Sequence, residues 1–142
     1  MTAVRRVLQY GIAGILWATG IGKLLDVPEF AQVLSTYQAF PPWALRPVAV
    51  AFVLVELRLA EWLALGKQLP QAALASLALH SAFACWSAVT LLRGIAVPNC
   101  GCFGVFWARP LTWTTVGEDL LLVLLSFVLY RLAIQTSRHM RK

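Results

Sequence analysis

The chain has 142 residues, of which 60% are hydrophobic and only 13% are charged, and its mean hydropathy is +0.74. A soluble domain carries about 25% charged residues, so this composition excludes an ordinary soluble protein and indicates an integral membrane protein. The formal net charge is +6. The basic residues lie at the ends of the predicted helices rather than in a stripe with interleaved aromatic residues, which argues against nucleic-acid binding.

Four apolar segments are long enough to cross a bilayer. They cover about residues 7–25, 47–65, 70–92 and 112–134, and each approaches or exceeds the roughly 17–25 residues of a tilted spanning helix. The first continues into Gly22-Lys23 without a convincing small-residue cleavage site, so we interpret it as a span and not as a signal peptide. The sequence therefore predicts an all-α membrane protein, an antiparallel bundle of four transmembrane helices that forms a single domain over residues 1–142.

A short helix is predicted between the first two spans. Asp26-Val27-Pro28-Glu29 resembles a helix start with Asp26 as its cap, and Pro41-Pro42 ends the segment. Apolar side chains recur between these points at helical spacing, at Phe30, Val33, Leu34 and Tyr37. Two interpretations stay open: an amphipathic helix on the membrane surface, or a connecting helix packed over the bundle.

The distribution of basic residues predicts the orientation. The termini and the turn at 66–69 carry seven of them: Arg5, Arg6, Lys67, Arg131, Arg138, Arg141 and Lys142. The opposite side carries four: Lys23, Arg46, Arg93 and Arg109. Because cytoplasmic loops are enriched in Lys and Arg, we expect cytoplasmic termini in a prokaryotic inner membrane and an extracytoplasmic loop at 93–111.

That loop contains Asn99-Cys100-Gly101-Cys102-Phe103-Gly104, with two of the three cysteines one glycine apart. A disulfide between them closes a very small ring, which can hardly reach the unstrained α-carbon separation of about 5.5–6 Å, so the bond would be easily reduced. A structural disulfide across such a short loop would also contribute little stability, because closing it removes little conformational entropy from the unfolded chain. Cys100 and Cys102 are therefore candidate catalytic residues for redox chemistry, or ligands for a soft metal.

Several neighbours of the pair have two interpretations each. Arg93 and Arg109 bracket the loop, where they lower the pKa of a thiolate or bind an anionic head group, or else serve as snorkelling anchors. Phe103, Phe106 and Trp107 make the second half of the loop aromatic. They are expected either to line a quinone site with the two arginines or to belong to an interfacial aromatic belt.

Two further residues of the third span carry reactive groups. Cys85 is expected about 12 Å below the outer end of the span, buried in the membrane, as an inert packing residue or as a redox relay. His80 lies deeper and is expected to be a hydrogen-bonded structural group and not a ligand.

Charged residues inside spans are costly and point to function. Arg58 and Glu61 are three residues apart and are expected to pair along one helix face. Glu56 lies near the middle of its span without an oppositely charged partner on its own helix, so we expect it to be protonated if buried. It would then carry a proton, donate a hydrogen bond to a carbonyl ligand, or hydrogen-bond to another helix.

A charged cluster is expected beneath the cysteine loop. Lys23, either Glu118 or Asp119, and Arg93 are predicted to lie at a similar depth. Such a cluster either pins the helices together or exchanges the protons that dithiol chemistry requires. Lys23, Glu56, Arg93, Asp119 and Cys85 are thus the predicted supporting residues.

Several stretches of the chain resemble one family. These are Gly20-Ile21-Gly22-Lys23-Leu24-Leu25-Asp26, Phe30, Leu54-Val55-Glu56-Leu57 and Asn99-Cys100-Gly101-Cys102-Phe103-Gly104. Together they are similar to the MauE branch of the DoxX-like membrane proteins, and the similarity covers nearly the whole chain. The Cys-Gly-Cys-Phe-Gly run is its specific part.

The resemblance implies a four-helix membrane protein associated with thiol redox. The name-giving member assists maturation of a disulfide-rich methylamine dehydrogenase subunit, and related proteins accompany thioredoxin-like or rhodanese-like partners. By this similarity Cys100 and Cys102 are the reactive pair, and Glu56 and Lys23 are supporting family positions. Members often have Asn where this chain has Asp119, so the resemblance gives that position no role.

The leading hypothesis is a thiol–disulfide oxidoreductase, comparable in purpose to DsbB and VKOR-type enzymes. Its disulfide would accept electrons from an exported thioredoxin-like protein or substrate dithiol. Without a second cysteine pair, the electrons would pass directly to a lipid quinone, ubiquinone or menaquinone, near Phe103, Trp107 and Arg93. Two alternatives are a soft-metal (Cu or Hg) binding or transport protein and a non-catalytic maturation factor for an exported redox protein.

Overall fold

The computed structural model describes residues 2–139, and every regular element in that range is helical. The elements are α1 (Thr2–Leu24), α2 (Val27–Thr36), the 3-10 helix η1 (Pro42–Ala44), α3 (Leu45–Leu65), α4 (Leu69–Leu92) and α5 (Trp113–His139). The prediction of an all-helical protein is confirmed. Of the basic residues used for the orientation, Arg141 and Lys142 lie outside the described range.

Two of the helices are long and apolar enough to span a membrane, namely Leu69–Leu92 and Trp113–Ser137. They coincide with the third and fourth predicted spans. The first and second predicted spans form the long helices α1 and α3, whose passage through the bilayer stays a prediction. The composition and these two helices together support a membrane protein.

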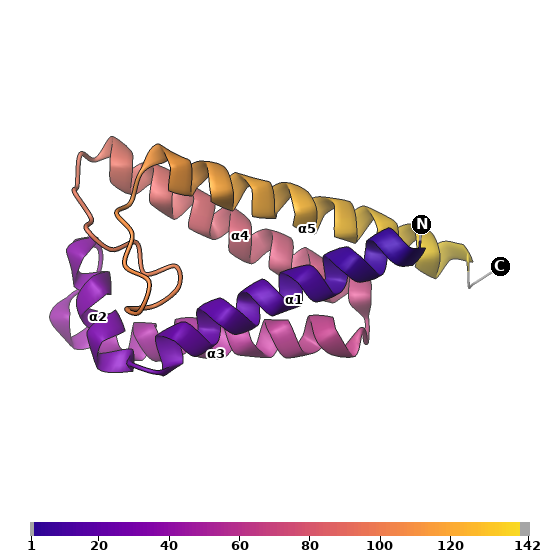
Figure 1. Cartoon of the computed structure of the whole chain (residues 1–142), viewed down its shortest axis with the longest axis horizontal. Helices are drawn as coiled ribbons and strands as arrows, with labels where there is room; N and C mark the ends of the chain where they lie inside the picture. The colour runs from indigo at the N-terminus through magenta and orange to yellow at the C-terminus, as the bar shows by residue number, and fades with distance from the viewer. Residues whose placement is uncertain (1, 140–142) are drawn as a thin grey trace.

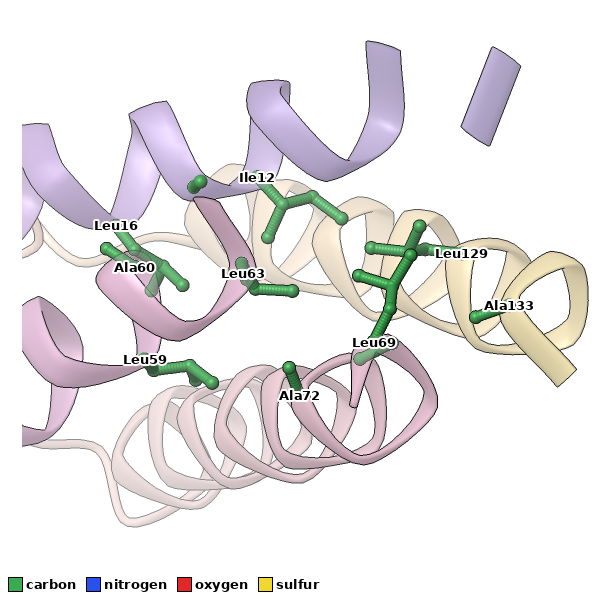
Figure 2. Packing of buried hydrophobic residues seen from close by; sticks show 11 residues of the cluster. Ile12, Leu16, Leu59, Ala60, Leu63, Leu69, Ala72, Leu129 and Ala133 are labelled. Atoms are coloured by element: carbon green, nitrogen blue, oxygen red, sulfur yellow. The ribbon is translucent and has the colours of Figure 1, made fainter. Parts of the chain in front are cut away.

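The four long helices are arranged in two pairs, α1 with α3 and α4 with α5. The pairs meet near the end that holds both chain termini and diverge toward the other end, where α2 and the loop between α4 and α5 lie between them (Figure 1). The end where the helix pairs meet has an apolar core to which all four long helices contribute. Figure 2 shows this core, including Ile12, Leu63, Leu69 and Leu129.

The short helix α2 covers the end at which the two helix pairs diverge (Figure 1). The Asp26 carboxylate accepts a hydrogen bond from the Glu29 backbone N–H at 3.0 Å, which confirms the predicted cap. The apolar face of α2 is buried in a second core with residues of α3 and of the cysteine loop, among them Phe30, Val33 and Val97. Of the two interpretations, the structure supports the connecting helix packed over the bundle.

Two glycines allow the cysteine loop to lie directly on α1. A Cβ atom added to Gly22 would be 2.5 Å from the Phe103 carbonyl oxygen, and one added to Gly104 would collide with the Gly22 carbonyl. Gly104 also has a φ of +73°, a conformation that favours glycine. The close approach of two backbones therefore fixes the position of the loop over the end of α1.

We expect Gly22→Ala to destabilise the protein by about 1–3 kcal/mol, because the added methyl group forces the loop away from α1. Gly14→Ala is the matched control on the same helix, since a Cβ atom there meets nothing within 4 Å. Alanine favours helix over glycine by up to about 1 kcal/mol, so the control should be neutral or stabilising. Unfolding of both variants in detergent measures the difference, and equal stability would contradict the proposed close contact.

Candidate functional site

The cysteine loop is held by backbone hydrogen bonds between its two halves. The Cys100 N–H donates to the Arg109 carbonyl at 2.7 Å, and the Leu111 N–H donates to the Val97 carbonyl at 2.9 Å. Gly101 has a φ of +71°, and a Cβ atom there would be 3.0 Å from Phe30 of α2. The glycine between the cysteines is therefore required both by the turn and by its packing against α2.

Both cysteines of the loop are thiols with different surroundings. Cys100 is buried and Cys102 is half-buried. The Cys102 N–H lies 3.4 Å from Cys100 Sγ. Hydrogen bonding from Cys102 lowers the pKa of Cys100 to about 6, and the positive charge of Arg109 also lowers it. The same interaction, together with burial, raises the pKa of Cys102, so Cys100 carries the thiolate of the reduced pair.

This assignment predicts an acidic midpoint for the alkylation of Cys100. The rate should rise with pH as the thiol ionises, reach half its maximum near pH 6, and fall about tenfold per pH unit below that value. Peptide mass spectrometry after brief iodoacetamide pulses would measure it in the reduced Cys85→Ser variant. An ordinary cysteine has a pKa of about 8.5, and a midpoint there would contradict the assignment.

Beneath the loop, Lys23 of α1 forms a buried ion pair with Glu56 of α3. Lys23 Nζ lies 2.7 and 2.8 Å from the two carboxylate oxygens and 3.0 Å from the Cys102 carbonyl oxygen. The two residues are only 5% and 1% exposed. As expected, Glu56 has no oppositely charged partner on its own helix, but Lys23 of α1 supplies one that the sequence did not reveal. Gly20 brings the helices together, since a Cβ atom there would be 2.8 Å from the Leu57 side chain.

The residues that were predicted to form one charged cluster instead make separate contacts. Glu118 pairs with Arg109 at 3.1 Å, while Asp119 accepts a hydrogen bond from Ser87 at 3.1 Å. The guanidinium of Arg93 donates to the carbonyl oxygens of Tyr37 and Gln38, at 3.3 and 3.4 Å. Lys23 therefore takes neither of the acidic residues of α5 as its partner, and Arg93 ties the end of α4 to the end of α2.

Tyr37 is a site residue that the sequence did not reveal. Its hydroxyl donates a hydrogen bond of 2.7 Å to the Cys100 carbonyl oxygen. The sequence pattern marked it only as part of an apolar helix face. Tyr37 and Lys23 thus bind the carbonyl oxygens on either side of Gly101, so both cysteines are held by side chains from the helices below.

A cavity of about 380 Å³ lies beneath the cysteine pair. It is lined by both cysteines and by residues of all four long helices and α2, with polar side chains from Lys23, Tyr37, Glu56, His80, Ser87 and Asp119. Phe52, Phe83 and Trp86 contribute aromatic walls. Leu121 also lines the cavity and is 54% exposed, so the cavity reaches the apolar outer surface of α5.

The residues predicted to bind a quinone separate into two groups. Phe103 and Arg109 line the cavity, whereas Trp107 and Arg93 do not. Trp107 is 66% exposed and packs against Phe103 with 5.8 Å between the ring centroids. The four residues therefore do not gather around one cavity, because the loop folds back between the helix pairs and carries only Phe103 and Arg109 to it.

Cys85 and His80 lie on different faces of α4. Cys85 is exposed on the outer surface of the bundle and does not line the cavity. It lies within the candidate membrane span Leu69–Leu92, so its expected position inside the membrane stays a prediction. His80 is buried and has Nδ1 at 3.0 Å from the Ser126 hydroxyl and 3.3 Å from the Ser76 hydroxyl. The prediction of a hydrogen-bonded histidine is confirmed.

Two remaining predictions concern pairs and metals. Arg58 and Glu61 form the expected ion pair at 2.8 Å on the surface. Among the side chains that the structure describes, residues 3–137, no three His, Cys, Asp or Glu gather as ligands for a metal ion. The hypothesis of a soft-metal site therefore depends on the two loop thiols alone.

Comparison with known proteins shows which family the chain resembles. The family model "Methylamine utilisation protein MauE" matches residues 1–131. The methylamine utilization protein MauE of Paracoccus denitrificans is 32% identical over 122 residues, which are 86% of this chain and 66% of that protein. The MauE protein of Methylorubrum extorquens is 32% identical over 113 residues, 80% of this chain and 61% of that protein.

This chain thus spans about two thirds of the length of the first relative and less of the second. No solved structure matches it. The family model covers all the helices up to Arg131 in α5 and includes the Cys-Gly-Cys loop. The chain belongs to the MauE family.

Proposed function

We propose that this protein is a membrane thiol–disulfide oxidoreductase with four spans. The Cys100–Cys102 pair takes electrons from an exported thioredoxin-like protein or substrate dithiol and passes them to a membrane quinone. The observation that carries the proposal is the position of the two loop cysteines, with the Cys102 backbone nitrogen 3.4 Å from Cys100 Sγ, at the end of a mainly apolar cavity between the helices. The lowered pKa of Cys100 supports it. The names of the two relatives make methylamine utilisation the first process in which to look for the partner.

The proposed orientation has cytoplasmic termini and an extracytoplasmic cysteine loop in a prokaryotic inner membrane. Two observations support it. Both termini lie at one end of the molecule and the cysteine loop lies at the other (Figure 1). The basic residues are also more frequent on the side of the termini, as in cytoplasmic loops. The loop would then face an oxidising compartment where disulfides persist.

The first half-reaction begins with the oxidised pair. A partner thiolate attacks Cys102 Sγ, the Cys100–Cys102 bond breaks, and Cys100 leaves as a thiolate. Cys100 is the better leaving group because its thiol has the lower pKa, and Cys102 is the less buried of the two residues. The second partner thiol then attacks the partner sulfur of the mixed disulfide and releases Cys102. The partner is oxidised to a disulfide, and the pair gains two electrons.

The second half-reaction reoxidises the pair. The quinone accepts two electrons and two protons and leaves as a quinol, while the Cys100–Cys102 disulfide forms again. The cavity fits such a ligand, since binding pockets commonly measure about 300–1,000 Å³ and are mainly apolar. Trp86 and Phe103 would hold the ring by stacking, while Lys23 keeps the cysteine loop over the cavity. The opening beside Leu121 would leave space for the isoprenoid tail in the bilayer.

A trapping experiment tests the first half-reaction. The oxidised Cys85→Ser variant is mixed with a thioredoxin-fold protein that retains only its nucleophilic cysteine. We expect a covalent complex, because that partner has no second thiol to resolve it, and peptide mapping should find the partner on Cys102. The reduced protein is the control and should give no complex. A complex mainly on Cys100 would overturn the roles of the two cysteines, and the absence of any complex would contradict the proposed exchange.

A further inference from the structure

His80 has an unusual environment at the wall of the cavity. The residue is 2% exposed, and its Nδ1 atom is engaged by Ser126 and Ser76 at 3.0 and 3.3 Å. The two serine hydroxyls lie 3.1 Å apart, and both are fully buried. The ring lines the cavity, and Nε2 has no hydrogen-bond partner among the described residues. One side of the ring is therefore fixed by the protein, and the other remains available to a ligand.

Three other polar side chains at this cavity, Lys23, Glu56 and Asp119, already have partners. Lys23 and Glu56 pair with each other, and Asp119 is bound by Ser87. His80 has only neutral partners in the part of the chain that the structure describes. A hydroxyl both donates and accepts hydrogen bonds, so the two serines satisfy either neutral tautomer of the ring. Nε2 can therefore donate to a carbonyl oxygen in one tautomer and accept from a hydroxyl in the other.

His80 lies at about the same depth in the bundle as the Lys23–Glu56 pair. Glu56 lies about nine residues from the end of α3, and His80 about eleven residues from the start of α4, at the turn that joins the two helices. At about 1.5 Å per residue, the two side chains differ in depth by only about 3 Å. The Lys23–Glu56 pair is linked to the Cys102 carbonyl. His80 thus lies across the cavity from the groups that hold the cysteine loop.

We propose that His80 Nε2 is the polar contact for the head group of the quinone, donating to a carbonyl of the quinone and accepting from a hydroxyl of the quinol. This inference rests on the proposed function for the identity of the ligand. The ring of the ligand lies between His80 on α4 and the Lys23–Glu56 pair on α1 and α3, below the two cysteines. His80 binds and orients the ligand, and the tautomer exchange lets the same contact serve both redox states.

The test measures binding to the oxidised protein, in which the disulfide cannot reduce the quinone. The probe is ubiquinone-1, titrated by calorimetry into the protein in detergent. We expect His80→Leu to weaken its binding about tenfold, as for the loss of one buried hydrogen bond. His80→Gln retains a donor and an acceptor and should bind within about threefold of the original protein. Cys85→Ser is the control on the same helix outside the cavity and should bind normally.

Equal affinity of the leucine variant and the original protein would overturn the inference, as would equally weak binding by the leucine and glutamine variants. If the leucine variant does not fold, the infrared carbonyl bands of bound ubiquinone-1 decide the question. We then expect one band at lowered frequency in the original protein and a different shift in His80→Gln. The same band in both proteins would contradict contact with His80.

The outcomes separate this inference from the proposed function. Binding that depends on His80 without any oxidation of the cysteine pair by quinone would support the binding site and refute the quinone-coupled reaction. Oxidation of the pair by quinone with no effect of His80→Leu on binding would support the function and refute the role of His80.

Discussion

Replacing either cysteine of the pair by serine should lower the rate of dithiol oxidation by at least about 1,000-fold, because neither half-reaction is possible with one sulfur. The rate is measured as loss of quinone absorbance with an excess of a thioredoxin-like dithiol. Cys100→Ser removes the leaving thiolate, and Cys102→Ser removes the sulfur that the partner attacks. Both variants should therefore be inactive, although for different reasons.

The third cysteine provides the matched control for this prediction. Cys85 is exposed on α4 and outside the cavity, so Cys85→Ser should keep the rate within about twofold of the original protein. Activity above about a tenth of the original rate in Cys100→Ser or Cys102→Ser would show that the pair is not the reactive centre. The loop would then have a docking role, as in a non-catalytic maturation factor.

Lys23→Met should destabilise the protein by about 3–5 kcal/mol. The substitution leaves Glu56, which is 1% exposed, without its cation, and an uncompensated buried charge is costly. It also removes the hydrogen bond to the Cys102 carbonyl. Titration with a denaturing detergent, followed by loss of helical signal, measures the free energy of unfolding.

Two further variants show whether the ion pair causes this effect. Lys23→Met combined with Glu56→Leu should regain most of the lost stability, because apolar residues of similar size commonly replace a buried ion pair without cost. Arg58→Ala breaks an exposed pair and should cost only about 0–1 kcal/mol. Full stability in Lys23→Met, or no recovery in the double variant, would contradict the account of this pair.

The sequence predicted those features that depend on local patterns. The third predicted span, residues 70–92, agrees closely with α4 at Leu69–Leu92, and Asp26 caps α2 as expected. The ends of α1 and α5 were less accurate. Helix α1 already begins at Thr2, and helix α5 continues to His139. Hydropathy identifies only the apolar part of a helix that extends into polar residues.

The site depended on contacts between distant segments, which local patterns do not contain. The residues around Glu56 do not reveal that Lys23 approaches from another helix where Gly20 permits close packing. Similarly, a helical period shows that α4 is apolar on most sides but not which side faces the cavity, so the sequence did not reveal that Cys85 lies on the outer surface of the bundle. The hydrogen bond from Tyr37 requires the loop to fold back over α2.

The divergence of the two helix pairs explains how a small protein can provide such a site. The apolar core at one end holds the four long helices together, and the other end is kept apart by α2 and the cysteine loop (Figures 1 and 2). The two loop cysteines thereby lie at the end of an internal, mainly apolar cavity. In the proposed function, a partner protein and a quinone would approach this pair from different sides.

The most direct test of this account is mass-resolved alkylation of the reduced, purified protein before and after addition of ubiquinone-1 or a short-chain menaquinone analogue. The account predicts that Cys100 and Cys102 both become resistant to alkylation while one equivalent of quinol forms, and that Cys85 is unchanged. If both loop thiols remain alkylatable and no quinol appears with either analogue, the proposed transfer of electrons from the pair to a quinone is contradicted.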